Sequence, residues 1–303
     1  MSDSAVPART SAALQRLPAH CKSPARPGPA VFEMKRMLRG RGLHSVCEEA
    51  RCPNLPECFA RGTVTFMLLG DVCTRACRFC HVATGLGRPV DPKEPEQVAA
   101  AAAELGLRHV VLTSVNRDDL LDQGSTQFVR AIAALRQAAP RATVEVLTPD
   151  FRGDAECIDR VADARPEIYN HNLETVPRLY REVRIGARYP RSLALLARVK
   201  ARQPATITKS GVMLGMGETR AELLELFGDL RARDVDCLTL GQYLRPTLAH
   251  RPVTRYLEPA EFAELADAAR GLGFRHVESG PLVRSSFHAD TVATLLSPLR
   301  GAP

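Results

Sequence analysis

The chain of 303 residues contains no tryptophan, and aromatic residues make up only 5% of it. Proteins that bind single-stranded nucleic acid use aromatic side chains on which bases stack, interleaved with basic residues. No such patch occurs in the sequence, which disfavours a nucleic-acid partner. A stretch of about 18 consecutive apolar residues is also lacking, and this disfavours a membrane-spanning helix.

The first 30 residues lack the apolar stretch of a secretory signal. They are rich in Ala, Pro and Arg, and they contain one acidic residue, Asp3. We therefore expect residues 1–30 to form a disordered extension, and the protein to be soluble and cytoplasmic with no membrane partner. A mitochondrial transit peptide is the alternative that this composition leaves open.

Hydrophobic residues make up 45% of the chain, and the formal net charge is +7. A chain of this length can bury a large core, which predicts one domain of roughly 200 to 250 residues with appendages. The excess of positive charge predicts a surface that attracts acidic partners.

Apolar, β-rich runs alternate with helical patterns over residues 61–279, as is typical of βα units around a parallel sheet. The predicted strands span 63–69, 109–115, 143–149, 167–173, 206–214 and 236–243, and helical patterns span 94–105, 127–138, 192–201 and 219–233. Six units are too few for a closed eight-stranded barrel. We therefore expect an α/β fold with an open, partial (β/α)6 TIM-like barrel, and a doubly wound sheet is the alternative.

Polar residues gather at the downstream ends of these predicted strands, where parallel α/β folds form their active sites. The candidates for cofactor contacts are Thr113, Ser114, Asn172, Glu174 and Lys209. Each residue alone is equally well explained as a helix cap or a turn residue. Their recurrence after successive strands favours a shared site.

Nine cysteines are present, and six of them lie between residues 47 and 80. In a cytosolic protein an odd, clustered set of cysteines is more typical of a metal site than of disulfides. We expect the outlying Cys21, Cys157 and Cys237 to be structural.

The stretch CTRACRFC places Cys73, Cys77 and Cys80 directly after the first predicted strand. Three thiolates cannot complete a tetrahedral zinc site, and no second C-x2-C pair follows them. The segment CRFCH matches the attachment sequence of c-type haem, but that chemistry needs export and would leave Cys73 without a role. A four-iron cluster held by three thiolates instead keeps one iron open to a ligand.

A second triplet, CEEARCPNLPEC, places Cys47, Cys52 and Cys58 upstream of the first. Three cysteines within 12 residues, flanked by charged side chains, are poorly explained as ordinary buried thiols. This group also lacks one ligand for a four-iron cluster.

The C-x3-C-x2-C triplet after a first barrel strand resembles that of the radical S-adenosylmethionine (SAM) superfamily. From about residue 31 to 295 the chain further resembles the lipoyl synthase family. The matching stretches are CEEARCPNLPEC, CTRACRFC, TSVNRDDL (113–120), NHNLETVPRLY (170–180), TKSGVMLGMGE (208–218), LTLGQYLRPT (238–247) and GPLVRSSFHAD (280–290).

This resemblance implies two [4Fe–4S] clusters and SAM as cofactors. It assigns Cys73, Cys77 and Cys80 to a radical-generating cluster, with Phe79 near the adenine. It assigns Cys47, Cys52, Cys58 and Ser286 to an auxiliary cluster that is the sulfur source, with Ser285 as the less favoured serine. A serine oxygen is a hard donor on an otherwise thiolate site, so its bond should be labile.

The implied architecture has an auxiliary-cluster segment at 31–60, the partial barrel at 61–279 and a serine-bearing carboxy-terminal segment at 280–303. Two departures from the family pattern are Phe287, where the family commonly has Tyr, and the missing tryptophan ahead of the first triplet. Neither departure removes a predicted ligand.

The resemblance implies insertion of two sulfur atoms at C6 and C8 of a protein-bound octanoyl-lysine, the second step of endogenous protein lipoylation. The expected partners are octanoylated carrier domains (the E2 subunits of 2-oxoacid dehydrogenases and the glycine cleavage H protein), an external reductant and an Fe–S cluster carrier. Carrier domains are acidic as a family, which suits the net charge of +7. Two alternatives are another auxiliary-cluster radical SAM enzyme that inserts sulfur, and a non-enzymatic two-cluster electron carrier.

Overall fold

The computed structural model describes residues 16–287 and residue 292. The first half of the predicted amino-terminal extension, and most of the predicted segment 280–303 beyond Phe287, lie outside the described residues. Within the described part of the chain, no helix is both long enough and apolar enough to cross a bilayer.

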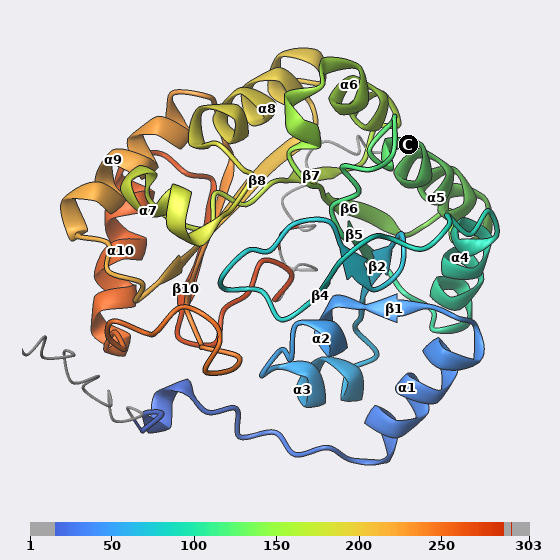
Figure 1. Cartoon of the computed structure of the whole chain (residues 1–303), viewed down its shortest axis with the longest axis horizontal. Helices are drawn as coiled ribbons and strands as arrows, with labels where there is room; N and C mark the ends of the chain where they lie inside the picture. The colour runs from blue at the N-terminus through green and yellow to red at the C-terminus, as the bar shows by residue number, and fades with distance from the viewer. Residues whose placement is uncertain (1–15, 288–291, 293–303) are drawn as a thin grey trace, which may run out of the picture.

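A curved sheet of eight strands forms the centre of the molecule (Figure 1). In spatial order the strands are β1 (His44–Ser45), β2 (Thr65–Leu68), β5 (His109–Ser114), β6 (Thr143–Leu147), β7 (Ile168–Asn170), β8 (Ile207–Leu214), β9 (Cys237–Gln242) and β10 (His276–Gly280). Only β1 runs antiparallel to its neighbour. Since β1 and β10 are the two edges of the described sheet, the barrel is open.

All six predicted strands are confirmed, whereas the seventh parallel strand, β10, was not predicted. In β10 only Val277 is buried, so the segment lacks the apolar run that marks the other parallel strands. The prediction of six βα units is therefore one strand short, and the antiparallel β1 adds a further strand at the opposite edge.

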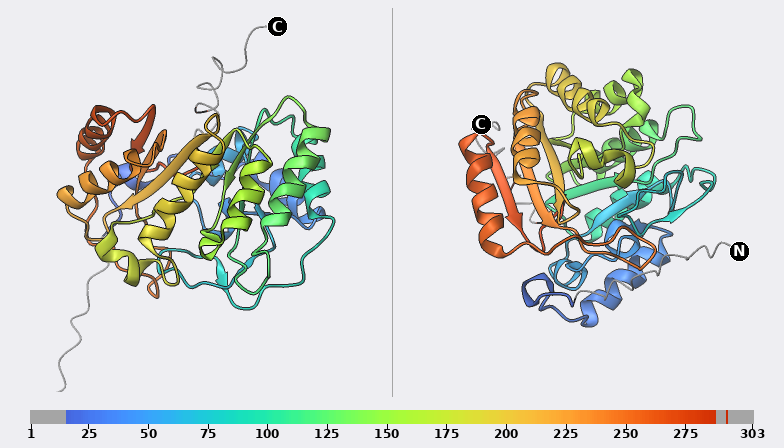
Figure 2. Two further views of the ribbon diagram at one scale, coloured as in Figure 1. Left: turned by 90° about the horizontal axis from the view of Figure 1, so that it is seen from above. Right: turned by 60° about the vertical axis from the view of Figure 1, so that its left-hand side comes forward.

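Helices cover the outer face of the sheet, as the two views of Figure 2 show. They are α4 (Glu94–Glu104), α5 (Ser125–Ala138), α6 (Ala155–Asp163), α7 (Pro177–Val183), α8 (Tyr189–Arg202), α9 (Arg220–Arg231) and α10 (Pro259–Gly271). The four predicted helical patterns correspond to α4, α5, α8 and α9. Local signals set several helix starts: in α9, for example, Thr219 and Glu222 form a capping box.

Three helices precede the barrel: α1 (Pro29–Gly40), α2 (Val46–Glu49) and α3 (Leu55–Ala60). Upstream of them, Ala19–Cys21 forms a single 3-10 turn in which Cys21 is buried. His20 Nδ1 lies 3.8 Å from Glu258 Oε2, next to the start of α10. Within the predicted extension, residues 19–21 are therefore packed against the barrel.

A buried polar cluster lies on the face of the sheet that carries Glu145, Asn170 and Lys209. Lys209 Nζ lies 3.0 Å from Glu145 Oε1, and Asn170 Nδ2 donates to the same oxygen at 3.1 Å. Burial alone would raise the pKa of Glu145, but the charge of Lys209 and contact with His109 outweigh it and lower that pKa. An ion pair thus joins β6 to β8 across the inside of the barrel.

Candidate functional site

The loop that carries CTRACRFC begins at the carboxyl end of β2, at the mouth of the barrel. Cys73 belongs to the short strand β3 (Val72–Cys73), which pairs with β4 (Ala83–Thr84). The backbone N–H groups of Arg75 and Asn116 donate to Cys73 Sγ at 3.4 and 3.3 Å. Hydrogen bonds of this kind to sulfur are a feature of iron–sulfur ligands.

The three thiols of this loop are close enough to affect one another electrostatically. Burial raises the pKa of Cys77 to about 11, and neighbouring Cys73 and Glu174 raise it further against the opposing charge of Arg184. Burial likewise raises the pKa of Cys80 to about 12. Thiols with such pKa values stay protonated at neutral pH unless a metal displaces the proton.

Arg75, inside the triplet, anchors the loop to two neighbouring strand ends. Its guanidinium lies 2.7 Å from Asp118 Oδ2, after β5, and 2.8 Å from Asp150 Oδ1, after β6. Burial alone would lower the pKa of Arg75, but the two carboxylates raise it instead. The cysteine loop is therefore held by charge-assisted contacts to the barrel.

Further contacts join the loop to segments that are distant in sequence. His250 Nε2 lies 2.9 Å from the carbonyl oxygen of Cys80, and His81 Nδ1 lies 3.0 Å from that of Glu49. The two imidazole rings stack with their centroids 6.0 Å apart. Because Glu49 ends the helix that holds Cys47, His81 links the two cysteine groups through the fold.

The second cysteine group lies on α2 and α3 and on the turn between them. Burial raises the pKa of Cys47 to about 12, with Cys52 the next cause, and raises that of Cys58 to about 11. The thiol of Cys52 has the guanidinium of Arg284 as its main charged neighbour. The structure thus gathers the second triplet and brings the carboxy-terminal segment to it.

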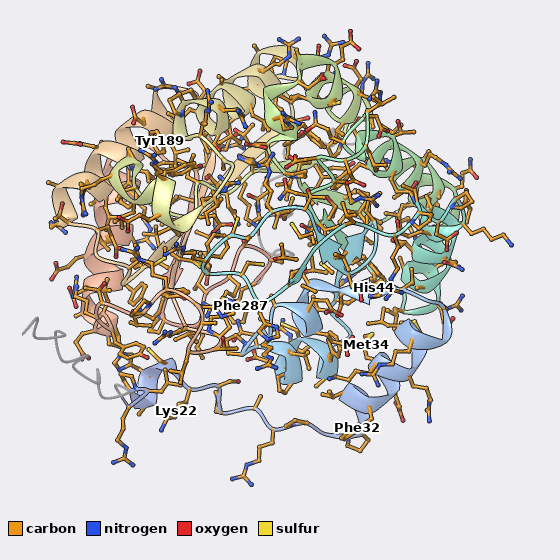
Figure 3. The ribbon with its side chains drawn as sticks, in the orientation of Figure 1. Lys22, Phe32, Met34, His44, Tyr189 and Phe287 are labelled. Carbon is orange, nitrogen blue, oxygen red and sulfur yellow. The ribbon has the colours of Figure 1, made fainter. Side chains whose placement is uncertain are left out.

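Two contacts fix the course of residues 282–284. Asn54 Nδ2 donates to the carbonyl oxygen of Leu282 at 2.7 Å. A Cβ atom placed on Gly241 of β9 would lie 2.1 Å from the carbonyl oxygen of Val283, so only glycine allows this close passage. Figure 3 shows Phe287, the last residue of the continuous described chain, in the middle of the molecule beside the amino-terminal helices.

The residues that follow β7 contact the carboxy-terminal segment and lie near the first cysteine group. Asn172 Nδ2 donates to Ser285 Oγ at 2.7 Å and to Glu174 Oε1 at 3.1 Å. Glu174 has a left-handed backbone with φ of 68°, which is uncommon for a residue with a side chain and favours a functional role. Burial raises its pKa, against the charges of Arg184 and Arg284.

The other predicted residues differ in their surroundings. Thr113 Oγ1 donates to the carbonyl oxygen of Leu147 at 2.9 Å, and half-buried Phe79 packs against the main core. Lys209 is paired with Glu145 inside the barrel, and no described hydrogen bond or ion pair joins it to either cysteine triplet. Half-buried Ser286 makes no hydrogen bond to any described residue, whereas Ser285 is held by Asn172.

Several buried polar atoms at the barrel mouth have no partner among the described residues. They include Ser114 Oγ, Asn116 Oδ1 and Asn172 Oδ1. Since buried polar groups are nearly always hydrogen-bonded, these atoms fit a site that receives a polar ligand. Within the described chain, no three His, Cys, Asp or Glu side chains are close enough to bind a single metal ion. An iron–sulfur cluster does not need such an arrangement, because each of its protein ligands binds a different iron atom.

The residue types and contacts fit the expected cofactors. Each triplet supplies thiols, one of them accepts backbone hydrogen bonds, and unpartnered amide and hydroxyl groups lie beside the first triplet. The roles of Arg75, Arg184 and Asn54 were not predicted. A buried arginine or asparagine has no distinguishing local pattern, although Arg75 does lie within CTRACRFC.

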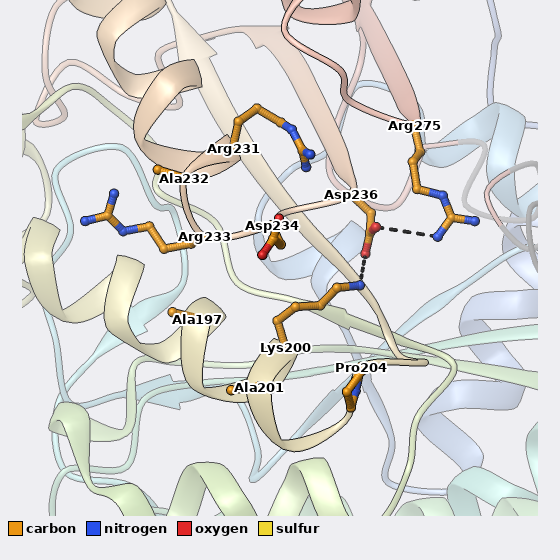
Figure 4. A pocket seen from close by; sticks show the side chains of 10 residues that line it. All are labelled: Ala197, Lys200, Ala201, Pro204, Arg231, Ala232, Arg233, Asp234, Asp236 and Arg275. Atoms are coloured by element: carbon orange, nitrogen blue, oxygen red, sulfur yellow. Dashed lines mark hydrogen bonds and ion pairs between the residues drawn. The ribbon is translucent and has the colours of Figure 1, made fainter.

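A surface hollow of about 480 Å³ lies at the opposite end of the barrel, where β9 and β10 begin (Figure 4). There Lys200 Nζ lies 2.7 Å and Arg275 Nη1 3.5 Å from the two carboxylate oxygens of Asp236. These ion pairs tie α8 and the start of β10 to the start of β9. Active sites of such folds form at the other end of the strands, so we interpret the ion pairs around this hollow as contacts that stabilise the fold.

Known structures share the fold at low sequence identity. Methylornithine synthase (PylB) matches with a TM-score of 0.54 and 14% identity, covering 70% of this chain and 69% of that chain. Streptococcus suis SuiB bound to precursor peptide SuiA matches with a TM-score of 0.56 and 13% identity, covering 86% of this chain and 56% of that chain. At these identities the likeness concerns the fold alone.

Sequence relatives are much closer. Residues 67–230 match the Radical SAM superfamily. The lipoyl synthase of Methylococcus capsulatus is 57% identical over 89% of this chain and 84% of its own length. The lipoyl synthases of Nitrosococcus oceani and Rubrobacter xylanophilus are 53% and 54% identical over 92% and 86% of this chain, and over 86% and 82% of their own lengths. The chain belongs to the lipoyl synthase family of the radical SAM superfamily.

Proposed function

We propose that this protein is a lipoyl synthase that inserts two sulfur atoms at C6 and C8 of an octanoyl chain carried on a lysine of a carrier domain. One observation carries the proposal: two separate cysteine triplets flank the same barrel mouth, and the serine-bearing segment contacts the second. The membership in the lipoyl synthase family supports it independently.

Cys73, Cys77 and Cys80 would hold the radical-generating cluster, and Cys47, Cys52 and Cys58 the auxiliary cluster. When bound, the clusters and SAM supply a 5′-deoxyadenosyl radical for hydrogen abstraction and the sulfur that is inserted. The backbone N–H groups of Arg75 and Asn116 orient Cys73 by donating to its sulfur. Arg75, through Asp118 and Asp150, keeps this loop in place over the mouth.

Asn172 and Glu174 are the best-supported candidates for contacts to SAM. Asn172 is buried and Glu174 half-buried at the mouth, and the charge of Glu174 reaches Cys77 and Cys80. Ser114 would add its unpartnered hydroxyl, and Phe79 an apolar surface. The hydrogen bond of Thr113 to Leu147 and the ion pair of Lys209 favour structural roles for these two residues.

Ser286 is the proposed fourth ligand of the auxiliary cluster. Its neighbour Ser285 already shares a hydrogen bond with Asn172, whereas the Ser286 hydroxyl has no described partner. The charge of Arg284 acts on the thiol of Cys52, which supports a position of this segment beside the second triplet. A hard oxygen ligand among soft thiolates favours release of that iron when sulfur leaves.

Residues 31–60, 61–279 and 280–303 keep the roles predicted for them: auxiliary-cluster segment, barrel and ligand-bearing end. The substrate is an octanoylated carrier domain. An external reductant must supply electrons, and an Fe–S cluster carrier must rebuild the auxiliary cluster, because its sulfur is consumed. The cytoplasm stays the compartment that the sequence predicts.

Anaerobic reconstitution followed by reaction with an octanoyl-lysine peptide, SAM and a reductant tests the function. We expect about eight irons per chain, as two four-iron clusters require, together with 5′-deoxyadenosine and lipoyl product. Deoxyadenosine without sulfur insertion would favour another radical SAM enzyme. A protein with about four irons would contradict the two-cluster assignment, and one with eight irons but no deoxyadenosine would favour an electron carrier.

A further inference from the structure

Two loops at the mouth of the barrel are joined into one surface by the radical-cluster loop. The first comprises residues 181–188, from the end of α7 onward, and the second residues 245–251, after β9. The backbone N–H of Arg78 donates to the carbonyl oxygen of Val183, and that of Arg251 to the carbonyl oxygen of Arg78, both at 2.9 Å. In Figure 1, α7 lies close to the cyan loop that contains Arg78.

A side-chain ion pair reinforces this connection. Arg251 Nη1 lies 2.8 Å from Glu182 Oε2, so the two loops contact each other directly. Glu182 is the only acidic residue within the two loops, and its pKa is lowered by hydrogen bonding to Arg251. The one negative charge of the surface is therefore already neutralised.

Three exposed arginines on this surface lack an acidic partner. Arg78, Arg181 and Arg188 are exposed, and none of them forms an ion pair with any described residue. This distinguishes them from most exposed arginines on the outer helices, such as Arg198 and Arg202, which pair with aspartates on α6. Uncompensated positive charge next to the mouth attracts an acidic partner.

Exposed apolar side chains lie between these charges. Ile185 is 41% exposed and Leu248 is 66% exposed, although large aliphatic residues are usually buried. A surface that combines apolar contacts with a cationic rim is typical of protein recognition rather than of simple solubility. The exposed arginines and the two aliphatic residues, Arg78, Arg181, Ile185, Arg188 and Leu248, define what we call the rim patch.

We propose that the rim patch is the docking surface for the folded, acidic carrier domain that presents the octanoyl-lysine chain. The inference rests on the proposed function, because a lysine with an eight-carbon acyl chain can reach the mouth only if its domain contacts the surrounding surface. The patch adjoins the loop that holds Cys77 and Cys80. Docking there positions the acyl chain over the radical site.

The test compares two double variants that change the net charge equally. Arg181→Glu/Arg188→Glu alters the rim patch. Arg108→Glu/Arg141→Glu alters two exposed arginines, also without a described ion pair, that precede β5 and β6 at the opposite end of the barrel. The probes are an octanoylated lipoyl domain with a net negative charge and a short octanoyl-lysine peptide. The Kd of the lipoyl domain for each anaerobic holoenzyme is measured by calorimetry at two salt concentrations.

We expect the rim variant to raise the Kd for the lipoyl domain by about tenfold at low salt and to weaken its salt dependence, because charges at an interface rim act mainly on steering. The rate at which the rim variant lipoylates the peptide should stay within about twofold of that of the parent enzyme. The control variant should bind the lipoyl domain with the Kd of the parent enzyme. Ile185→Asn, which removes the apolar contact without adding a charge, should also weaken binding of the domain, without a change in salt dependence.

Three outcomes would contradict the proposed docking surface. The two double variants could weaken binding of the lipoyl domain equally, or the rim variant could lose as much turnover with the peptide as with the domain. A short DNA duplex could also bind as tightly as the lipoyl domain. If the parent enzyme lipoylates the peptide yet the rim variant binds the domain normally, only the docking surface is wrong. If the parent enzyme produces no lipoyl group from either probe, the proposed function itself is wrong.

Discussion

Asn172 Nδ2 donates a hydrogen bond to Ser285 Oγ at 2.7 Å, and this contact joins residues 113 positions apart. The same amide donates to Glu174, beside the first cysteine triplet. Ser285 precedes Ser286, the proposed ligand for the second triplet. One buried side chain therefore connects the two halves of the proposed site, and several expected outcomes depend on it.

Asn172→Ala should loosen the carboxy-terminal segment, because it removes the hydrogen bond to Ser285. We expect faster amide hydrogen exchange over residues 282–287 and loss of lipoyl product. Iron bound by the first triplet should remain. Asn54→Ala, which removes the contact to Leu282, should have the same effect on exchange; unchanged exchange in both variants would show that these amides do not hold the segment.

The two serines should behave differently when they are substituted. Ser286→Ala should abolish sulfur insertion while SAM cleavage continues, because it removes the proposed ligand oxygen. Ser285→Ala should only reduce the yield. Ser286→Cys should retain the auxiliary cluster but release sulfur poorly, since a thiolate binds iron more firmly than a hard oxygen. Product yield and iron spectroscopy measure these effects; a greater loss in Ser285→Ala would assign the ligand to Ser285.

The two cysteine triplets should be separable. Cys47→Ala should still cleave SAM but insert no sulfur, and Cys77→Ala should do neither. Each variant should retain about four of about eight irons per chain. Iron analysis together with assays for 5′-deoxyadenosine and lipoyl product distinguishes them. Cleavage of SAM by Cys77→Ala would reject the assignment of the first triplet.

Gly241→Ala should displace the carboxy-terminal segment, because its new methyl group would lie 2.1 Å from the carbonyl oxygen of Val283. We expect loss of auxiliary-cluster iron and a destabilisation of about 1–3 kcal/mol. Gly228→Ala in α9 is the matched control, since no atom lies within 4 Å of its added Cβ. That variant should keep full activity and melt at the same or a higher temperature.

His171 should make the fold less stable in acid. Its ring contacts the carbonyl oxygen of Thr148 at 2.8 Å and Ser192 Oγ at 2.9 Å, and burial, aided by the charge of Arg184, lowers its pKa to about 3. Below about pH 6.5 the unfolded chain binds a proton that the folded chain does not. The free energy of unfolding should therefore fall by about 1–2 kcal/mol between pH 6.5 and 5.

Thermal unfolding of the anaerobic holoprotein across this pH range measures the effect of His171. The variant His171→Asn should be less stable at pH 7.5, but its stability should decrease less on acidification. A variant with the same pH dependence as the parent protein would show that another group titrates.

Local sequence determined much of the fold and the local grouping of the cysteines. The six predicted strands appear where apolar, β-rich runs indicated them, because strands of a parallel sheet covered on both faces need such runs. The spacing within CTRACRFC and CEEARCPNLPEC also brought each triplet together, since residues so close in the chain stay close after folding. These features depend on separations of a few residues.

Tertiary structure alone decided how the parts meet. The contact of Asn54 with Leu282 spans 228 positions, and β10 joins the sheet although its sequence has little apolar character. The pairing of Lys209 with Glu145 likewise depends on which side chains share the inside of the barrel. Such contacts arise from the packing of whole elements, and because packing is a property of all the elements together, no short pattern in the chain encodes it.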